Sequence, residues 1–293
     1  MNSAKKGKVA LVFIVCLILL NIFSWQEVFN LVENKYLKVI FFDVGQGDAI
    51  FIETPQKHQI LIDGGPDSEI LEKLGRVLPF WDRKIDLVIL THPEKDHISG
   101  LIEVLKSYKV EYILWTGIIR DTAEYREWQK LIKEEGADVF IAQAGQNIEL
   151  ARNDIANLEV LYPFESLEGQ EMKDSNNTSV ITKLVYGESS FLFTGDIYQS
   201  VERELLNLVK QRLESDVLKV GHHGSKTSSA EEFIEKVAPE IAVIQAGRDN
   251  SYGHPHEITL ATLEKYGINI LRTDLDGDIK IISDGYAVST IQN

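Results

Sequence analysis

Three strand-like runs in this sequence each end in side chains that can bind a metal ion. Residues 85–90 lead into Thr91-His92-Pro93-Glu94-Lys95-Asp96-His97, residues 190–194 into Gly195-Asp196, and residues 217–220 into Gly221-His222-His223-Gly224-Ser225. Short apolar runs bounded by turn residues are typical of buried strands. Strand ends that deliver imidazole and carboxylate groups predict a site for a divalent transition metal such as zinc or manganese.

Composition narrows the class of protein. The 293 residues accommodate one domain of about 250 residues after a short N-terminal segment. The net charge of −15 argues against non-specific nucleic-acid binding through a broad basic face. A single cysteine, Cys16, excludes an internal disulfide and a cysteine-rich metal cluster. Any bound metal must therefore use histidine, aspartate or glutamate.

The N-terminus carries a separate signal. Lys5, Lys6 and Lys8 precede an uncharged stretch over residues 9–26, which reaches the lower edge of the roughly 17–25 residues that span a bilayer. The basic flank predicts a cytoplasmic tip and an extracytoplasmic remainder. A cleaved signal peptide and a merely buried helix are the alternatives, although residues 21–25 offer no Ala-x-Ala-like cleavage site.

The order of elements predicts an α/β (α+β) fold. Strands in meanders alternate with helix-strand units, and both halves of the chain show a similar order, as in a duplicated layout. Two mixed sheets packed face to face, with helices outside, accommodate these elements. We expect residues 1–36 to form the basic tip, anchor and linker, and residues 37–293 to form one domain.

Seven motifs occur in an order that matches a known family: Phe42-Asp43-Val44-Gly45-Gln46-Gly47-Asp48-Ala49, Leu61-Ile62-Asp63-Gly64-Gly65, Thr91-His92-Pro93-Glu94-Lys95-Asp96-His97-Ile98-Ser99-Gly100, Asn176-Asn177-Thr178-Ser179, Thr194-Gly195-Asp196, Gly221-His222-His223-Gly224-Ser225 and Tyr252-Gly253-His254-Pro255. From residue 37 onwards the chain resembles the metallo-β-lactamase superfamily, a four-layer αββα hydrolase fold. Within it, the chain is similar to the C-terminal extracytoplasmic domain of the DNA-uptake channel protein ComEC and its free-standing relatives. The resemblance implies a hydrolase with one or two divalent ions, Zn²⁺ or Mn²⁺.

The resemblance also implies a ligand set. It points to Asp96, His97, Asp196 as a bridge, and one of His222 and His223, of which it favours His222; His92 contributes further. The superfamily's usual motif is His-x-His-x-Asp-His, and Glu94 stands here in place of the middle histidine. Asn176-Asn177 stand where the next histidine of the first metal site is expected. The first site is therefore expected to be weak and, with Glu94 as an oxygen ligand, to favour a harder ion such as manganese.

Further residues receive roles from their motifs. Asp96, His254 and Asn177 are the candidate catalytic residues, with His254 facing substrate or donating a proton and Asn177 aiming an amide at developing negative charge. Loop histidines and turn asparagines are the simpler alternatives. Candidate substrate-binding residues are Asn176, His223, Ser225, Lys226 and Arg248. The residues expected to brace the metal loops through hydrogen bonds are Asp43, Gln46, Asp48 and Asp63.

The predicted reaction is phosphodiester hydrolysis by metal-activated water. The resemblance implies nuclease action on single-stranded DNA during uptake, by a protein held in the membrane through residues 9–26 and acting with a partner in a DNA-uptake complex. Two alternatives stay open. One is hydrolysis of a teichoic acid or phospholipid headgroup, and the other is a catalytically silent metal-binding module, since Glu94 and Asn176-Asn177 weaken one site. The oligomeric state is left open.

Overall fold

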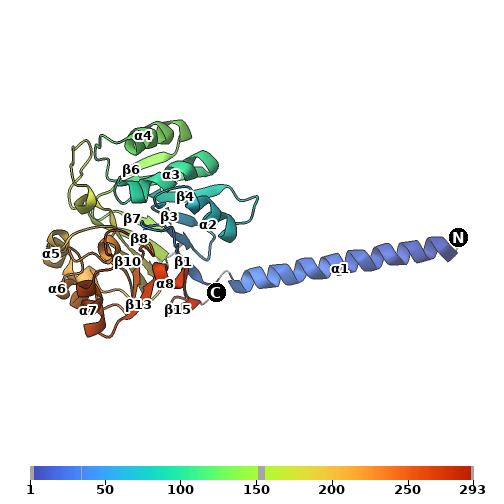
Figure 1. Ribbon diagram of the computed structural model, residues 1–293. Coiled ribbons are helices and arrows are strands. Elements are labelled where there is room, and N and C mark those ends of the chain that lie inside the picture. The colour runs from blue at the N-terminus through green and yellow to red at the C-terminus, as the bar shows by residue number, and fades with distance from the viewer. Residues whose placement is uncertain (1–2, 34, 151–155, 292–293) are drawn as a thin grey trace.

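Two β-sheets lie face to face at the centre of the protein (Figure 1). The computed structural model describes residues 3–33, 35–150 and 156–291. The first sheet has the strand order β15-β14-β1-β2-β3-β4-β5-β6 and the second β13-β12-β11-β10-β9-β8-β7. The strands of the first sheet are β1 (Leu37–Phe41), β2 (Ile50–Glu53), β3 (Gln59–Ile62), β4 (Lys84–Ile89), β5 (Lys109–Trp115), β6 (Asp138–Ile141), β14 (Ile279–Ser283) and β15 (Val288–Ile291). Those of the second are β7 (Asn147–Glu149), β8 (Ala156–Tyr162), β9 (Ile181–Tyr186), β10 (Ser189–Phe193), β11 (Val217–Lys219), β12 (Ile241–Ile244) and β13 (Asn269–Arg272).

Helices cover the outer face of each sheet, which confirms the expected mixed α/β fold with two sheets and helices. Three buried clusters of apolar side chains define the layers: one between the sheets, one under each set of helices. Between the sheets, Phe41 of β1 meets Phe193 of β10 with ring centroids 6.2 Å apart. The first sheet is covered by α2 (Glu69–Val77), α3 (Lys95–Ser107) and α4 (Ala123–Glu135), and the second by α5 (Gln199–Leu208), α6 (Glu231–Val237) and α7 (Glu257–Lys265). Short helical segments lie at η2 (Asn176–Thr178), η3 (Lys210–Arg212), η4 (Gly221–Gly224) and α8 (Thr273–Asp276).

A close approach of two glycines sets the first turn of α3 against the end of β3. A Cβ atom on Gly100 would overlap the carbonyl oxygen of Gly64, so neither position accepts a side chain without a backbone shift. The Gly64 amide donates to the His97 carbonyl (2.9 Å) and the Gly100 amide to the Gly65 carbonyl (3.0 Å). Because the two segments touch, Asp63 after β3 lies beside His97 in α3.

Helix α1 (Ser3–Glu33) extends away from the two sheets (Figure 1). Its apolar window, Gly7–Trp25, has 19 residues and a mean hydropathy of 2.4. Within the described residues this helix is long and apolar enough to cross a membrane. The uncharged stretch over residues 9–26 therefore forms part of a single helix, while its membrane role stays a prediction, as does the domain boundary at residue 37.

Candidate metal centre

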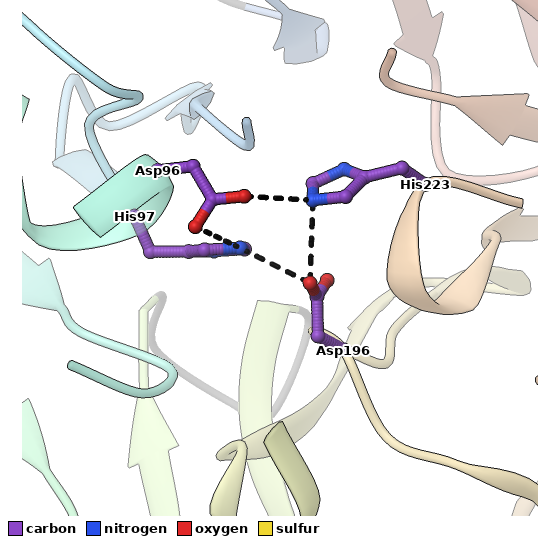
Figure 2. Close-up of side chains that lie close together, drawn as sticks. All are labelled: Asp96, His97, Asp196 and His223. Carbon is purple, nitrogen blue, oxygen red and sulfur yellow. Dashed lines mark hydrogen bonds and ion pairs between the residues drawn. The ribbon is translucent and has the colours of Figure 1, made fainter. Parts of the chain in front are cut away.

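Four side chains converge where the strands of both sheets end. Asp96 and His97 come from the first turn of α3 after β4, Asp196 follows β10, and His223 follows β11. Each offers one ligand atom, and these atoms all lie within 4.8 Å of one another. His223 Nε2 lies 3.3 Å from Asp96 Oδ2 and 3.2 Å from Asp196 Oδ2, while His97 Nε2 lies 3.3 Å from Asp196 Oδ2 (Figure 2). Two imidazoles and two carboxylates form a donor set suited to a divalent transition metal.

Hydrogen bonds on the far side of each ring orient these two histidines. His97 Nδ1 lies 2.8 Å from Asp63 Oδ2, and His223 Nδ1 lies 2.9 Å from the carbonyl oxygen of Gln245. Both partners accept hydrogen bonds, so each Nδ1 carries the proton and each Nε2 faces the carboxylates with its lone pair when the ring is neutral. Metal-binding histidines are held in this way. A lone pair opposite a carboxylate needs a cation between them, which a metal ion supplies.

The charges of the cluster favour a bound cation. Burial alone disfavours both imidazolium ions, but the nearby carboxylates, Asp196 foremost, raise the pKa of His97 and of His223 well above the ordinary value. Burial likewise opposes ionisation of Asp196, yet His223, His97 and Lys219 hold its pKa well below the usual range. Protons therefore balance these carboxylates when no ion is bound. Metal binding releases such protons, and the residues present fit the group that the fold implies.

A buried lysine lies beside the carboxylate of Asp196. Lys219, the last residue of β11, is 1% exposed. Its Nζ donates to the Gly195 carbonyl (2.9 Å), lies 3.4 Å from Asp196 Oδ1 and pairs closely with Asp48. Burial disfavours the ammonium ion, but Asp48 and Asp196 raise the pKa of Lys219 above its ordinary value. Sequence reasoning missed this residue, although a lysine in the otherwise apolar run before His222 was the available signal.

The backbone is strained where two strands present these side chains. Asp63 has φ 56°, His222 φ 50° and His223 φ 54°, all in the left-handed region. A residue with a side chain is uncommon there, at a cost of about 1–3 kcal/mol, and such strain persists where the surroundings enforce it. The backbone conformation of Asp63 is enforced by its side chain, which accepts hydrogen bonds from Thr91 N (2.8 Å) and Thr91 Oγ1 (2.6 Å). The strain turns the side chains after β3 and β11 towards the cluster.

The histidine of the pair that joins the cluster is His223, and His222, which the resemblance favoured, lies beside it. His222 is only partly buried, and its Nε2 is 3.3 Å from Asn176 Nδ2. Its ring instead belongs to a row of rings, with centroids 5.3 Å from Tyr198 and 5.5 Å from His254. The geometry therefore favours His223 as the ligand, and assigns His222 to the wall of the site.

Glu94 lies outside the four-residue cluster, and its carboxylate is already occupied. Glu94 Oε1 accepts from Arg120 Nη2 (2.7 Å) and from Ser175 Oγ (2.5 Å). His92 remains available: its Nδ1 meets Thr91 Oγ1 at 3.0 Å, and its buried Nε2 makes no hydrogen bond. Burial, together with neighbouring His97, lowers the pKa of His92 to about 3, so the ring is a neutral potential ligand.

His254 and Tyr252 extend the row of rings outward from His222. Tyr252 stacks on His254 with centroids 5.8 Å apart and is 70% exposed. Burial, and the neighbouring imidazoles of His223 and His222, lower the pKa of His254 to about 4. His254 is therefore neutral near pH 7, which does not favour the expected role of a proton donor. Its Nδ1 is buried without a hydrogen-bond partner, and the ring does face the site.

Other expected site residues are engaged in holding loops. The Asn177 side chain accepts from Tyr198 N (2.9 Å) and donates to Ser200 Oγ (3.1 Å), at the start of α5. Ser225 Oγ bonds Thr227 Oγ1 at 2.9 Å. Arg248 Nε donates to the Asp274 carbonyl (3.1 Å). These contacts favour structural roles for Asn177, Ser225 and Arg248, whereas the Lys226 side chain is exposed.

Of the four expected bracing residues, two touch ligand histidines. Asp63 orients His97, and Asp48 Oδ1 lies 3.3 Å from His223 Nδ1. Gln46 Oε1 accepts from Gly247 N (3.1 Å), and Asp43 Oδ1 accepts from Gly45 N (3.3 Å), so both act on backbone turns.

A cavity of about 560 Å³ lies elsewhere in the protein. It is lined by Leu87, Leu114 and Ile148 among others, and none of the cluster residues lines it.

Comparison with known proteins defines the class. The sequence profile of the Metallo-beta-lactamase superfamily matches residues 42–248, and the chain belongs to this superfamily, whose members are generally metal-dependent hydrolases. Among solved structures, the metallo-beta-lactamase fold protein YhfI from Bacillus subtilis shares the fold with a TM-score of 0.56 at 13% identity, over 87% of this chain and 100% of that one.

Similarity to curated proteins is more specific. The chain is 35% identical over 262 residues to "ComE operon protein 3" of Bacillus subtilis (strain 168), covering 83% of this chain and 32% of that protein. It is 31% identical over 252 residues to "Competence protein ComA" of Neisseria gonorrhoeae, covering 85% and 32%. The chain thus spans about a third of the length of these relatives. The ComEC-like resemblance is confirmed.

Proposed function

We propose that this protein is a divalent-metal-dependent phosphodiesterase that cleaves a single strand of DNA at the outer surface of a membrane. The convergence of Asp96, His97, Asp196 and His223 carries the proposal, because two imidazoles and two carboxylates within reach of one point form a donor set suited to a divalent ion. The names of the relatives, which are competence proteins, support DNA as the substrate.

The four converging residues would hold one ion, with His92 as a fifth ligand or as part of a second, weaker site. A divalent ion held by these residues would lower the pKa of water and would offset negative charge at a phosphate. Asp63 and the Gln245 carbonyl keep the two rings oriented, and Lys219 offsets the charge of Asp196 and Asp48 from behind. Both Zn²⁺ and Mn²⁺ suit these nitrogen and oxygen donors.

The row of rings beside the cluster supports a substrate that carries bases. Tyr198, His222, His254 and Tyr252 follow one another with centroid separations of 5.3, 5.5 and 5.8 Å. Proteins that bind single strands stack bases on such rings, at about 1–3 kcal/mol per base. The exposed Tyr252 is the outermost ring, so a strand lying over it would bring its backbone towards the cluster. Stacking also provides affinity that a chain of net charge −15 lacks in its overall field.

The charges around the apolar helix support an extracytoplasmic position of the domain. Lys5, Lys6 and Lys8 flank the apolar window on its N-terminal side, and such a flank is kept in the cytoplasm. We propose that the chain after Trp25 lies outside, where incoming DNA is met, and that it acts there with a partner in a DNA-uptake complex. Protease added to intact spheroplasts should then digest the domain, and full protection until lysis would contradict this side of the membrane.

Hydrolysis assays on the full-length protein test the activity. The protein, stripped of metal and then titrated with Mn²⁺ or Zn²⁺, is given single-stranded DNA, thymidine 5′-p-nitrophenyl phosphate and methyl p-nitrophenyl phosphate. We expect the protein to cleave DNA and to hydrolyse the thymidine diester faster than the methyl diester. Tyr252→Ala should slow hydrolysis of DNA and of the thymidine diester and leave hydrolysis of the methyl diester unchanged. Asp96→Ala should abolish turnover of all three in a folded protein.

The two alternatives predict different results in the same assay. Metal bound without turnover of any diester would favour the silent module. Turnover of both small diesters at equal rates, without cleavage of DNA, would favour another surface phosphodiester, such as a teichoic acid or phospholipid headgroup.

A further inference from the structure

Exposed aromatic side chains gather at one end of the first sheet. Phe80 and Trp81, in the loop before β4, are 81% and 72% exposed, and Tyr286, in the turn between β14 and β15, is 77% exposed. Tyr36, directly before β1, is also exposed. Water-exposed rings of this size are costly, because each leaves a large apolar surface in solvent. We call these four residues the aromatic end.

Strand register places all four residues at the same end. Lys38 at the start of β1 pairs with Glu53, and Glu53 pairs with Gln59 at the start of β3. Strand β4 runs parallel to β3, so its preceding loop lies at this end too. On the other side of β1, Leu37 pairs with Ser283, the last residue of β14. Strands lie about 4.8 Å apart, so the rings span about 20 Å from β14 to β4.

The chain reaches this end directly from the apolar helix. Residues 26–36 separate the apolar window from β1, with α1 continuing to Glu33. A helix rises about 1.5 Å per residue and an extended chain at most about 3.5 Å, so this segment spans no more than about 22 Å. Tyr186 Oη donates to the Lys35 carbonyl (3.0 Å), which ties the linker to the sandwich. The aromatic end is therefore the part of the domain that the helix holds nearest to its own apolar window.

Ring contacts and hydrogen bonds fix the loop that carries Phe80 and Trp81. The two rings meet edge to face with centroids 4.8 Å apart. Asp82 N donates to the Pro79 carbonyl (2.9 Å), and Asp82 Oδ2 accepts from Gln59 Nε2 (2.7 Å). The exposed pair is thus held out from the sheet by its own loop, and Figure 1 shows the connection between α2 and β4 projecting beyond the neighbouring elements.

Several cations at this end already have partners, and Arg83 donates to the Tyr108 hydroxyl (3.2 Å). Lys84 contacts Asp86 (2.8 Å) and Glu111 (2.5 Å), and Lys57 contacts Glu53 (3.1 Å). The exposed surface at the aromatic end is therefore marked by aromatic rings more than by net positive charge. Tyrosine and tryptophan concentrate at the level of lipid headgroups, where one part of the ring is apolar and the other wet. A bilayer surface matches this chemistry, and anionic lipids are not required.

We propose that the aromatic end rests in the interfacial layer of the bilayer that α1 crosses. The inference depends on the anchor of the proposed function and adds a second contact, which fixes how the domain stands. The metal cluster lies at the opposite ends of β3, β4, β10 and β11. Six residues of β4 alone span about 20 Å, so the cluster faces away from the lipid. Headgroups of the same bilayer are then out of its reach, which favours a soluble strand as substrate.

Tryptophan quenching in nanodiscs tests the proposal on the full-length protein. In a Trp25→Phe variant the remaining tryptophans are Trp81 and the buried Trp115 and Trp128. In zwitterionic phosphatidylcholine brominated near the headgroup end of its acyl chains, we expect Trp81 emission to shift to shorter wavelength and to be quenched. Adding Trp81→Phe should remove both effects. Equal emission in brominated and plain lipid would overturn the proposal, as would shielding of Trp81 without quenching, which indicates a protein partner or a second copy.

Matched probes separate this inference from the anchor. In the Trp25→Phe, Trp81→Phe background, Tyr286→Trp should be quenched and Tyr252→Trp, at the opposite end, should not. Quenching at Tyr252→Trp instead would reverse the orientation and overturn the proposal. Trp25 in a Trp81→Phe variant reports the anchor by itself. Quenched Trp25 with unquenched Trp81 defeats the aromatic contact alone, and no quenching of either defeats the anchor as well.

Discussion

Around the candidate metal centre, His97 and His223 are held in a different way from His92 and His222. The first two rings have Nδ1 against strong acceptors, Asp63 and the Gln245 carbonyl, and present Nε2 to carboxylates. The Nδ1 atoms of the other two meet hydroxyl groups, and His222 Nε2 faces an amide. We infer from this difference that the partner of Nδ1, more than the presence of a histidine, determines which ring is positioned for metal.

The carboxylates near these rings also differ in charge. Around His97 and His223 the carboxylates of Asp96 and Asp196 are left for a cation, whereas Glu94 is neutralised by Arg120. We therefore expect one tightly held ion and a weaker second position at His92. Four predictions test this contrast, taken in order of decreasing effect.

Replacing each of the two adjacent histidines in turn by alanine gives the largest expected contrast. His223→Ala removes a ring that faces both carboxylates, and we expect it to lose the bound metal. Turnover of thymidine 5′-p-nitrophenyl phosphate should fall by more than the roughly 100-fold seen when a residue that only supports a ligand is changed. His222→Ala should keep its metal, measured by elemental analysis. Metal lost from His222→Ala and kept by His223→Ala would reverse the assignment.

Lys219→Met should give the next largest effect, on stability. Removing one member of a buried charged pair costs about 3–5 kcal/mol, because Asp48 is left as a buried charge without its partner. A bound metal offsets the charge of Asp196, so the loss in free energy of unfolding should shrink when metal is added. Urea unfolding with and without Mn²⁺ measures both values. Lys226→Met, at an exposed site nearby, should change the free energy by less than about 0.5 kcal/mol. A Lys219→Met protein as stable as the unmodified one would contradict the role of Lys219 in offsetting the buried charge of Asp48.

Asp63→Asn tests how far orientation of His97 contributes. The amide can no longer hold the Nδ1 proton with a charged oxygen, and we expect metal affinity to fall about 10–100-fold while the fold is retained. Competition with a chromogenic chelator measures the affinity. The exposed Asp121→Asn provides the matched control. Unchanged affinity in Asp63→Asn would mean that packing alone positions the ring.

Glu94 should give the smallest effect, because its carboxylate is bound to Arg120 and Ser175. Glu94→His alone leaves the Arg120 cation beside the new imidazole, so we expect little gain in metal binding. The double change Glu94→His, Arg120→Gln should add a second binding event in calorimetric titration and shift preference towards zinc. Two tight, equivalent ions in the unmodified protein would show that Glu94 does not weaken the second position.

The sequence predicted the fold class, because buried strands and their turns are local patterns. The runs that become β4, β10 and β11 were recognisable, and so were Asp96, His97 and Asp196 at their ends. Hydropathy likewise identified the long apolar stretch that lies within α1. Each of these features depends on residues close together in the chain.

Only the tertiary structure favours His223 over His222 as the candidate ligand, since the two residues are adjacent in sequence and both have positive φ. The choice rests on the Gln245 carbonyl, which directly follows β12, the strand beside β11. The pairing of Glu94 with Arg120, 26 residues away, and the burial of Lys219 against Asp48 likewise follow from packing between segments distant in sequence. Composition and spacing determined which chemical groups are available, while the hydrogen-bond partners that orient and charge them exist only once the two sheets have closed on each other.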